Sequence, residues 1–347
     1  MQEHDVIIIG AGLAGLTAGA KLAKEGRKVL LIEQHTKIGG CATTFDRKIN
    51  GNRVTFEVGL HEMDGLDNEQ DRKINYFQDL GVFDHVDFIR VPEFYRITNG
   101  RMDVIVPHNV PEAIDSISKA FPEERKAVET FFSDISSIFG DYERMMEFST
   151  TSVGAYLDNL TSNEDLKFTL VGNLGYYGDD PYSLSMIYFS TAQNSYFKGG
   201  GHFIKGGSQT LSDYLGKVIT DNGGTIVCGH LVTKIIIKNN TAIGVNYIRH
   251  KQKEASEQQA YGNIILANAA IPNVVNDLLG DVLQETEYQK SVNLLQHACS
   301  LLCVYLAFSQ PPSNIGNKCY STFIYDKDIS LKDFSKIQKS NDYTKKG

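Results

Sequence analysis

Positive charge, paired cysteines and long apolar runs are all scarce in this sequence. The 347 residues include 34 Lys and Arg against 42 Asp and Glu, which gives a net charge of −8 and leaves no basic excess for binding nucleic acid. No apolar run reaches the roughly 18 residues of a membrane-spanning helix. The first residues, "MQEHDVIIIG", contain neither the basic nor the apolar region of a signal peptide. We therefore expect a cytoplasmic protein with no nucleic-acid partner, while peripheral contact with a membrane stays open.

The spacing of the cysteines excludes further classes of protein. The five cysteines form neither a CxxC nor a CxxxxC pattern, and they are Cys41, Cys228, Cys299, Cys303 and Cys319. Free thiols in a reducing compartment fit this spacing, and we expect no metal site. Without a CxxxxC pair, chemistry of the disulfide-reductase type is not expected. A second GxGxxG is also missing, so no second dinucleotide-binding domain is predicted.

The segment "DVIIIGAGLAGLTAGAKLAKEGRKVLLIEQ" predicts a strand, a helix and a second strand. The apolar run 6–9 is continuous, as in a strand that is buried on both faces. The helix is predicted over 13–25, with Gly26 ending it. The second strand is predicted over 28–32, and Glu33 stands at its end.

Three glycines between the first strand and the helix give the spacing GxGxxG. Gly10 allows a tight turn, Gly12 lets the backbone approach a pyrophosphate, and Gly15 lets the helix pack closely on the strand. The N–H groups at the start of the helix would face the phosphates. Glu33 can accept hydrogen bonds from a ribose and disfavours a 2′-phosphate, so NADP is not expected. The predicted contacts also include the neighbours Ala11, Leu13, Ala14 and Gln34.

A glycine pair, Gly39 and Gly40, follows the second strand closely in "QHTKIGGCATTFDR". This pair resembles the extended FAD motif of the glutathione-reductase-like flavoproteins, in which it lets a loop lie along the pyrophosphate. FAD is therefore the expected cofactor. An NAD dehydrogenase with a coincidental glycine pair is the alternative.

A second landmark lies in "GGSQTLSDYLGKVITDNGGTIVCGHLVTKIIIKNNTAIGVNYI" and "NIILANAAIPNVVNDLLG". It predicts a helix over 209–221, a strand over 225–228, a hairpin that turns at Asn239–Asn240, and a strand that leads through "ANAA" into a helix. Over about residues 4 to 310, this order resembles the phytoene-desaturase-like flavoproteins, which include carotenoid desaturases, carotenoid isomerases and retinol saturases. In the resemblance, the FAD-binding positions are Gly10, Gly12, Gly15, Glu33, Gly39 and Gly40, and Val232 meets the adenine through its backbone.

The segment "VTFEVGLHEMDG" follows the glycine pair, and in the resembling family this segment passes beside the isoalloxazine ring. The resemblance implies that Gly59 permits close approach and that Leu60 and His61 lie near the ring and the substrate. His61 is the candidate proton-handling residue of this stretch. A structural histidine is the alternative.

The region between the two landmarks is predicted to form most of a substrate domain. "EFYRIT" and "MDVIVP" predict paired strands across Asn99–Gly100, residues 111–148 predict two helices, and "CSLLCVYLAFS" predicts a further strand of the domain's sheet. Apolar residues recur at helical spacing at Val128, Phe131, Phe132, Ile135, Ile138 and Phe139. They predict either a core face or a functional face that lines a lipophilic tunnel or touches a membrane.

The C-terminal residues depart from the resembling family. Its members end with a glycine-rich strand, turn and helix that face the flavin, and "FSKIQKSNDYTKKG" has no such pattern. The sequence therefore predicts either a fragment or a truncated gene product. A truncated gene product would hold FAD from one side only.

Taken with the resemblance, these patterns predict an α/β fold: a glutathione-reductase-like FAD-binding Rossmann domain with an interleaved α+β substrate domain. The FAD domain is predicted over 1–75 and 205–280, and the substrate domain over 76–204 and 281–347. The implied function is desaturation, saturation or isomerisation of C=C bonds in a carotenoid- or retinoid-like polyene. The implied partners are an apolar substrate and an electron partner such as a quinone. Two alternatives stay open: an amine-oxidase-like flavoprotein, with Tyr176 and Tyr177 as an aromatic cage, and a non-catalytic FAD-binding protein.

Overall fold

The structure is a computed structural model that describes residues 3–138, 141–177, 180–252, 256–283, 286–295 and 301–339. Each of its two compact units gathers separate stretches of the chain. Unit 1 contains residues 1–62, 72–89 and 203–296, and unit 2 contains residues 63–71, 90–202 and 297–347. Both units are therefore discontinuous in sequence. Relative to the division predicted from the sequence, residues 63–71 lie in unit 2, and residues 76–89, 203–204 and 281–296 lie in unit 1.

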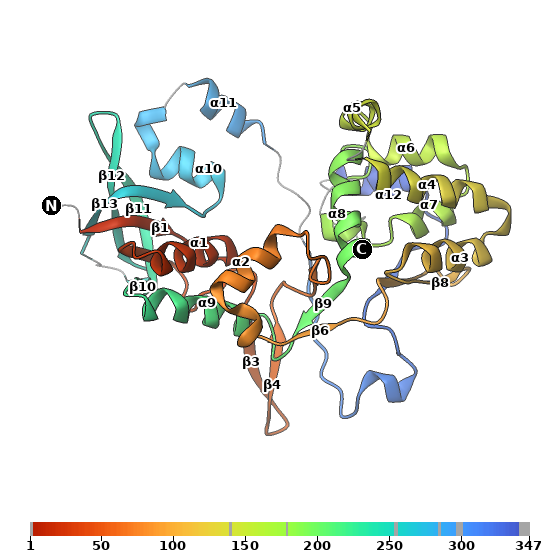
Figure 1. Ribbon diagram of the computed structural model, residues 1–347, viewed down its shortest axis with the longest axis horizontal. Coiled ribbons are helices and arrows are strands. Elements are labelled where there is room, and N and C mark those ends of the chain that lie inside the picture. Colours follow the sequence, from red (N-terminus) through yellow and green to blue (C-terminus); the bar gives the residue numbers. More distant parts are fainter. Residues whose placement is uncertain are drawn as a thin grey trace. The chain divides into compact units, whose positions relative to one another are not determined.

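Unit 1 combines strands and helices from its three separate stretches of the chain (Figure 1). Its strands are β1 (His4–Ile9), β2 (Val29–Glu33), β3 (Thr44–Ile49), β4 (Asn52–Glu57), β10 (Thr225–Cys228), β11 (His230–Lys238), β12 (Thr241–Arg249) and β13 (Gln258–Ala267). Its helical segments are α1 (Leu13–Lys24), α2 (Arg72–Leu80), η1 (Val82–Asp84), α9 (Gln209–Asp221), α10 (Ile271–Asn273), the π-helical η4 (Val274–Leu278), η5 (Gly280–Leu283) and α11 (Glu287–Asn293).

One mixed sheet organises unit 1, with the order β10-β2-β1-β13-β12-β11. β10, β2, β1 and β13 are parallel, whereas β12 and β11 are antiparallel to their neighbours. β13 belongs to both parts, because residues 258–261 pair with β12 and residues 262–267 pair with β1. β1 and β2 are joined by α1, so the predicted strand–helix–strand unit is confirmed.

Both faces of the parallel part are covered, which explains the continuous apolar run in β1. On one face, α1 and α9 lie side by side (Figure 1), and a Cβ at Gly19 of α1 would come within 2.8 Å of Ile219 and 3.3 Å of Ile8. On the other face, Ile7 and Ile9 belong to one core cluster with residues of β11, β12 and η4. Successive residues of β1 therefore alternate between two layers of packing.

Several predicted elements of unit 1 are confirmed. α1 ends at Lys24, and Gly26 follows with φ 82°, the left-handed conformation that glycine supplies after a helix. α9 spans the predicted residues 209–221, and β10 spans 225–228. The turn between β11 and β12 places Asn239 and Asn240 at φ 48° and 59°, which is the turn geometry that asparagine tolerates.

Unit 2 is mainly helical and contains a three-stranded sheet of order β14-β7-β8. Its elements are β5 (Met63–Asp64), β7 (Tyr95–Thr98), β8 (Asp103–Val106), α3 (Val110–Ala120), η2 (Pro122–Glu124), α4 (Arg125–Ser137), α5 (Tyr142–Thr150), α6 (Val153–Leu160), α7 (Glu164–Leu170), η3 (Leu174–Tyr177), α8 (Met186–Gly199), η6 (Pro312–Ile315), β14 (Thr322–Ile324) and α12 (Leu331–Lys339). The hairpin β7–β8 confirms the strands predicted around Asn99–Gly100. A further small sheet has the order β5-β9-β6 and includes β6 (Phe88–Arg90) and β9 (Gly201–Ile204). The boundaries between unit 1 and unit 2 fall within β6 and within β9.

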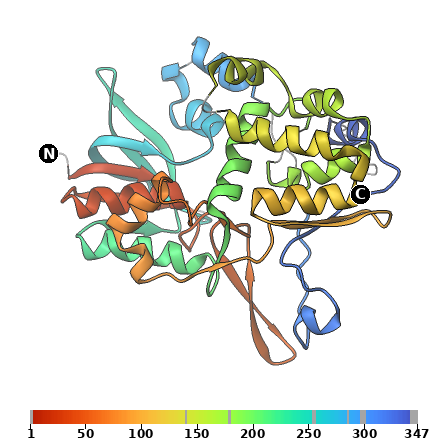
Figure 2. The ribbon, with the colours of Figure 1, turned by 45° about the vertical axis from the view of Figure 1, so that its right-hand side comes forward.

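The core of unit 2 decides between the two interpretations of the apolar face of α4. Phe131 and Phe132 are at most 2% exposed, and Val128, Ile135 and Ile138 are fully buried in the same cluster. The Phe131 and Phe132 rings lie 5.4 Å apart at an interplanar angle of 89°, a favourable edge-to-face contact. α3 and α4 run alongside each other over this cluster (Figure 2). These residues form a packed core, and Phe139 lies outside the described residues.

Two predictions about unit 2 are wrong. Residues 111–148 contain three helices instead of two, because the Asp141 side chain accepts a hydrogen bond from the Arg144 N–H at 3.0 Å and begins α5 as a separate helix. Residues 301–308 of the predicted strand "CSLLCVYLAFS" are not in a strand, and Leu302 is 92% exposed. Instead, β14 pairs with β7 in parallel. Residues 299 and 300, with Cys299, lie outside the described residues.

The described ranges contain neither a candidate membrane-spanning helix nor a candidate metal-ligand cluster. No helix there is long and apolar enough to cross a bilayer. Within these ranges, no three His, Cys, Asp or Glu side chains gather closely enough to hold a metal ion. The thiols of Cys41, Cys228, Cys303 and Cys319 are free.

Candidate functional site

The first glycine loop connects β1 to α1, and its backbone admits only glycine at two positions. Gly10 has φ 95°, and a Cβ there would lie 2.4 Å from the carbonyl oxygen of Asn268. A Cβ at Gly15 would lie 2.2 Å from the carbonyl oxygen of Gly10, so α1 approaches the loop more closely than alanine would allow. Both roles predicted for these glycines, a tight turn and close packing, match the geometry.

Gly12 differs from Gly10 and Gly15, because the backbone conformation and packing at Gly12 do not require glycine. Its φ of −67° and ψ of 170° are open to any residue. A Cβ at Gly12 would meet only the Asn268 side-chain nitrogen, at 3.1 Å. No side chain of the described residues caps α1, and its first turn has no acidic residue, so the N–H groups at the helix start stay available for an anion. The bare backbone at Gly12 therefore forms a cradle that a Cβ would fill.

Glu33 ends β2 directly beside the first glycine loop. Its carboxylate is 8% exposed and accepts hydrogen bonds from the N–H groups of Ala11 and His35, each at 2.7 Å. Because each carboxylate oxygen has two lone pairs, a second acceptor site remains on each oxygen for a ribose hydroxyl. The structure thus gives Glu33 a role that the sequence did not suggest, since it fixes the loop at Ala11. The next residue, Gln34, is exposed.

The second glycine loop packs directly against the first. The Gly39 N–H donates to the Ala11 carbonyl at 2.7 Å, and Gly39 forms an isolated parallel bridge with Gly12. A Cβ at Gly40 would lie 3.1 Å from the Gly12 Cα, and both glycines of the pair have positive φ, 121° and 61°. Sequence positions almost thirty residues apart therefore form one wall of bare backbone. That wall fits the pyrophosphate and ribose of a dinucleotide.

The other predicted site residues lie around this wall in unit 1. Leu13 and Ala14 form the first turn of α1, and Ala14 is exposed. Val232 is buried in β11 at a register shift between Val232 and Lys234, where its strand bulges. Bulges of this kind are frequent beside binding sites.

The segment 59–61 passes next to the second glycine loop. A Cβ at Gly59 would lie 3.3 Å from the carbonyl oxygen of Cys41, which follows the glycine pair. Leu60 is partly exposed and His61 is exposed in an irregular stretch between β4 and β5. The structure therefore brings Gly59 to the glycine pair, and it places His61 at the surface of the same unit.

Three residues that contribute to this geometry received no role from the sequence. Asn268, in "ANAA", donates its side-chain N–H to the Gly10 carbonyl at 3.3 Å, while its backbone N–H donates to Ile9 at 2.8 Å. In "GGSQTLS", Gln209 and Ser212 contact the second glycine loop from α9. The sequence signal for these residues was a polar side chain among small residues in each landmark. Such a signal marks a position in the chain, but it does not show which residue the side chain contacts.

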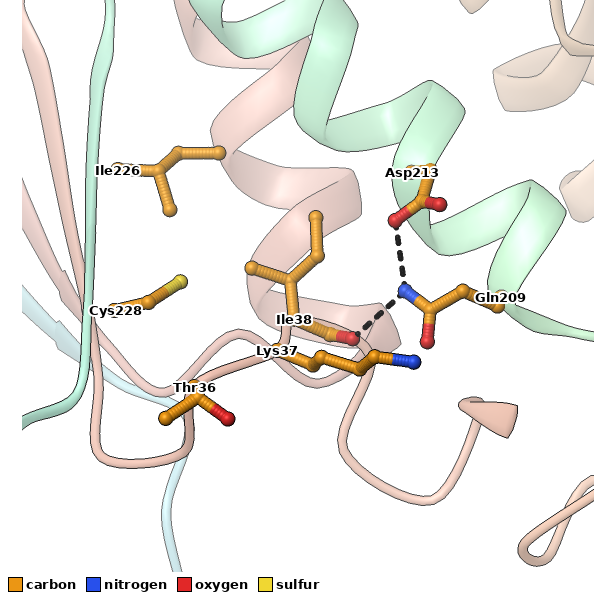
Figure 3. A pocket seen from close by; sticks show the side chains of 7 residues that line it. All are labelled: Thr36, Lys37, Ile38, Gln209, Asp213, Ile226 and Cys228. Atoms are coloured by element: carbon orange, nitrogen blue, oxygen red, sulfur yellow. Dashed lines mark hydrogen bonds between the residues drawn. The ribbon is translucent and has the colours of Figure 1, made fainter. Parts of the chain in front are cut away.

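A groove of about 330 Å³ lies between the segment 36–38, α9 and β10 (Figure 3). It is lined by Thr36, Lys37, Ile38, Gln209, Asp213, Ile226 and Cys228. Burial of Cys228 and the neighbouring Glu33 carboxylate raise the pKa of the Cys228 thiol above its usual value. The groove contains a Lys and an Asp, so it presents charge of both signs.

Comparison with known proteins agrees with this geometry. The family described as NAD(P)-binding Rossmann-like domain matches residues 8–80, which include both glycine loops. All-trans-retinol 13,14-reductase of Danio rerio is 27% identical over 93% of this chain and 57% of its own length. A 4,4'-diapophytoene desaturase of Methylomonas sp is 23% identical over 94% of this chain and 64% of its own length. Prolycopene isomerase of Daucus carota is 24% identical over 95% and 56%.

Solved structures share the fold at low identity. An oxidoreductase from Methanosarcina mazei matches 84% of this chain and 65% of its own chain, with a TM-score of 0.64 and 18% identity. A putrescine oxidase variant matches 79% of this chain and 59% of its own chain, with a TM-score of 0.52 and 18% identity. These likenesses establish the mixed α/β architecture.

The chain therefore contains a Rossmann-like domain of the NAD(P)/FAD-binding type. Its distant homologues over most of its length are retinol saturases, carotenoid desaturases and carotenoid isomerases. The chain spans little more than half the length of the retinol reductases and the isomerase that it matches.

Proposed function

We propose that this chain is an FAD-dependent oxidoreductase that acts on the C=C bonds of an apolar polyene of the carotenoid or retinoid type. The main support is the contact between the two glycine loops, where Gly39 bonds to Ala11 and Gly40 packs on Gly12. A simple NAD site needs only the first loop, whereas an FAD site uses both. The relatives, which cover 93% to 95% of the chain, support the polyene substrate.

The proposed roles of the residues follow from their backbone geometry. When bound, FAD supplies acceptance or release of a hydride equivalent at a carbon atom. The N–H groups at the start of α1 and the bare backbone at Gly12 and Gly40 bind the pyrophosphate. Glu33 accepts from the ribose hydroxyls with its remaining lone pairs, and the bulge at Val232 meets the adenine. Gly59 keeps the segment before His61 close to the second loop.

The three related reactions differ in their electron balance. Desaturation removes two electrons and two protons from the substrate, and the electrons then pass to an acceptor such as a quinone. Saturation adds the same number to the substrate, and isomerisation changes neither count. The proposed partners are therefore an apolar small molecule and, for the first two reactions, an electron donor or acceptor.

The amine-oxidase alternative needs two aromatic rings that face one space. Instead, the Tyr177 ring packs edge-on against Phe189 at 5.5 Å, and the Tyr176 ring packs on Phe323 at 5.4 Å. Each ring thus has its own packing partner, and no observation favours an amine substrate.

The exposed thiol of Cys41 provides a direct test of the cofactor. Cys41 follows the glycine pair, so FAD lying along that pair will shield it from alkylation. We expect FAD to slow the labelling of Cys41 at least tenfold, and NAD to leave it unchanged. Cys303 is exposed in unit 2 and is the matched control, because its labelling should not respond to FAD. Protection by NAD instead of FAD would favour the dehydrogenase alternative.

The reaction can be tested with the FAD-loaded chain and purified polyenes. Loss of one double bond shortens the conjugated system and shifts its absorption to shorter wavelength, while desaturation shifts it to longer wavelength. Isomerisation keeps the number of double bonds and is detected by chromatography. A chain that binds FAD but turns over no polyene, in the presence of a quinone acceptor or a reductant, would be a non-catalytic FAD-binding protein.

A further inference from the structure

The segment before the second glycine loop borders a groove and contacts α9. Residues 36–38 line one side of the groove of about 330 Å³, and residues of α9 and β10 line the others (Figure 3). The Ile38 side chain fills the space above Gly216 of α9, where a Cβ would lie 2.5 Å from the Ile38 Cδ1. Packing of Ile38 on α9 and hydrogen bonds of residues 38–43 together position this backbone.

Two side chains of α9 supply hydrogen bonds on both sides of the glycine pair. The Gln209 Nε2 donates to the Ile38 carbonyl at 3.2 Å, and the Gln209 Oε1 accepts from the Thr43 hydroxyl. One turn further along α9, the buried Ser212 hydroxyl donates to the Ala42 carbonyl at 2.7 Å. The loop is thus held before the pair, at Ile38, and after it, at Ala42 and Thr43.

The start of α9 is itself fixed in place. The Glu57 carboxylate, at the end of β4, accepts from the Ser208 N–H at 2.8 Å and also from the Ser208 hydroxyl. Within α9, the second N–H of the Gln209 amide donates to Asp213 at 2.7 Å, so all polar atoms of this side chain are used (Figure 3). A side chain with its amide fully bonded has one orientation.

We propose that Gln209 is a positioning residue for the proposed cofactor site, because it holds the glycine-pair loop in the bent conformation that packs Gly40 on Gly12. This inference deepens the FAD proposal and rests on it for the identity of the ligand. The position of the loop itself can be measured without any cofactor.

Three variants separate the contact with the loop from the contact within α9. Gln209→Glu keeps the size of the side chain but replaces the donor Nε2 with an acceptor, which repels both the Ile38 carbonyl and Asp213. Asp213→Asn alters only the pair within the helix and is the matched control. The double variant Gln209→Glu with Asp213→Asn restores a donor and acceptor within the helix and leaves the Ile38 carbonyl unpaired.

The cofactor-free measurement is the rate of tryptic cleavage after Lys37 in the apo chain. Cleavage after Lys48 and Arg53 in the β3–β4 hairpin serves as the internal control. We expect Gln209→Glu and the double variant to accelerate cleavage after Lys37 at least tenfold relative to the hairpin. Asp213→Asn should stay within threefold of the original chain.

The dissociation constant for FAD is the second measurement, and we expect it to rise at least tenfold in Gln209→Glu and in the double variant. Unchanged cleavage after Lys37 would overturn the proposal. Equal acceleration at the hairpin sites, or full recovery in the double variant, would also overturn it, because either result assigns Gln209 to the stability of α9. If the original chain binds no FAD while cleavage still responds as expected, the cofactor assignment fails and the positioning of the loop stands.

Discussion

Unit 1 and unit 2 reach a buried core by different means. Unit 1 packs aliphatic side chains on both faces of a mostly parallel sheet, and its loops depend on glycines whose backbone leaves no room for a Cβ. Unit 2 packs phenylalanine and tyrosine rings from helices and a small sheet, and it buries polar side chains among them. Where function depends on bare backbone, the sequence shows it directly as glycine. Where a core depends on side-chain shape, the same aromatic residue types are compatible with a site wall, a tunnel lining or a packed interior. The sequence therefore does not distinguish these three.

The buried histidine of unit 2 illustrates the second case. His108 is 3% exposed, and its ring stacks on Phe94 with centroids 5.5 Å apart. Burial, together with the nearby charges of Arg90 and His202, lowers the pKa of His108 to about 4, against a partial opposing effect of the Tyr196 backbone and Asp67. Nothing in "VPHNVPEAI" distinguishes this histidine from an exposed one.

The largest expected effect concerns the first glycine loop. Gly10→Ala combines a positive φ with a Cβ 2.4 Å from the Asn268 carbonyl, so we expect it to destabilise unit 1 by about 3 kcal/mol or more. Hydrogen exchange of the amides in β1 and β13 measures this loss. The control in unit 2 is Gly100→Ala, at φ 80° with nothing near the added Cβ, which should cost only about 1 kcal/mol. Similar losses at both sites would contradict the account of the close approach.

The next effect is a pH dependence that belongs to unit 2. Because the folded pKa of His108 is about 4 and the ordinary value is 6.5, the unfolded chain binds the proton first as the pH falls. The stability of unit 2 should be constant above pH 6.5 with respect to this group, and it should fall by roughly 3 kcal/mol towards pH 4. Urea unfolding at several pH values, followed through unit 2 amides, measures this slope. In His108→Phe the slope over this range should become shallower, and an unchanged slope would assign it to other groups.

Much of unit 1 could be predicted from the sequence because its elements end at residues with special backbone requirements. Gly26 ends α1, Asn239 and Asn240 form the turn after β11, and the spacing of Gly10, Gly12 and Gly15 located the first loop. The contacts of Gln209 and Asn268 could not be predicted, because they join residues far apart in the sequence. In unit 2, the composition of the eight residues after 300 predicts a strand, although no strand within the described part of the chain pairs with them.

A smaller effect separates cofactor binding from stability within unit 1. Gly12→Ala is compatible with the local φ and ψ, so its effect on the free energy of unfolding should stay within about 1 kcal/mol. Its affinity for FAD should fall at least tenfold, since the Cβ fills the space that the pyrophosphate needs. Gly26→Ala is the control with the opposite expected outcome. Its positive φ should lower the stability of the chain, whereas its affinity for FAD should not change, because Gly26 lies away from both loops. Calorimetric titration with FAD, alongside thermal unfolding of the apo form, tests the pair. Equal FAD affinity in Gly12→Ala and the original chain would contradict the proposed position of the pyrophosphate.

The smallest expected effect lies in the β11–β12 turn. Asn240→Gly removes a side chain at φ 59°, and we expect it to stabilise unit 1 by about 0.5 kcal/mol. Asn222→Gly, at φ −100° after α9, should instead destabilise, because it removes a hydrogen bond to Val218. Thermal unfolding of the two variants under the same conditions compares them. A loss of stability in Asn240→Gly would contradict the positive φ described for this turn.

The account rests on the two glycine loops forming one site for FAD, and an FAD titration of the purified chain tests this most directly. The titration should follow flavin fluorescence and the labelling of Cys41 in the same samples. The account predicts saturable FAD binding that protects Cys41 with the same midpoint and leaves Cys303 unaffected. Saturable binding of NAD with no response to FAD, or FAD binding that leaves Cys41 fully reactive, would contradict it.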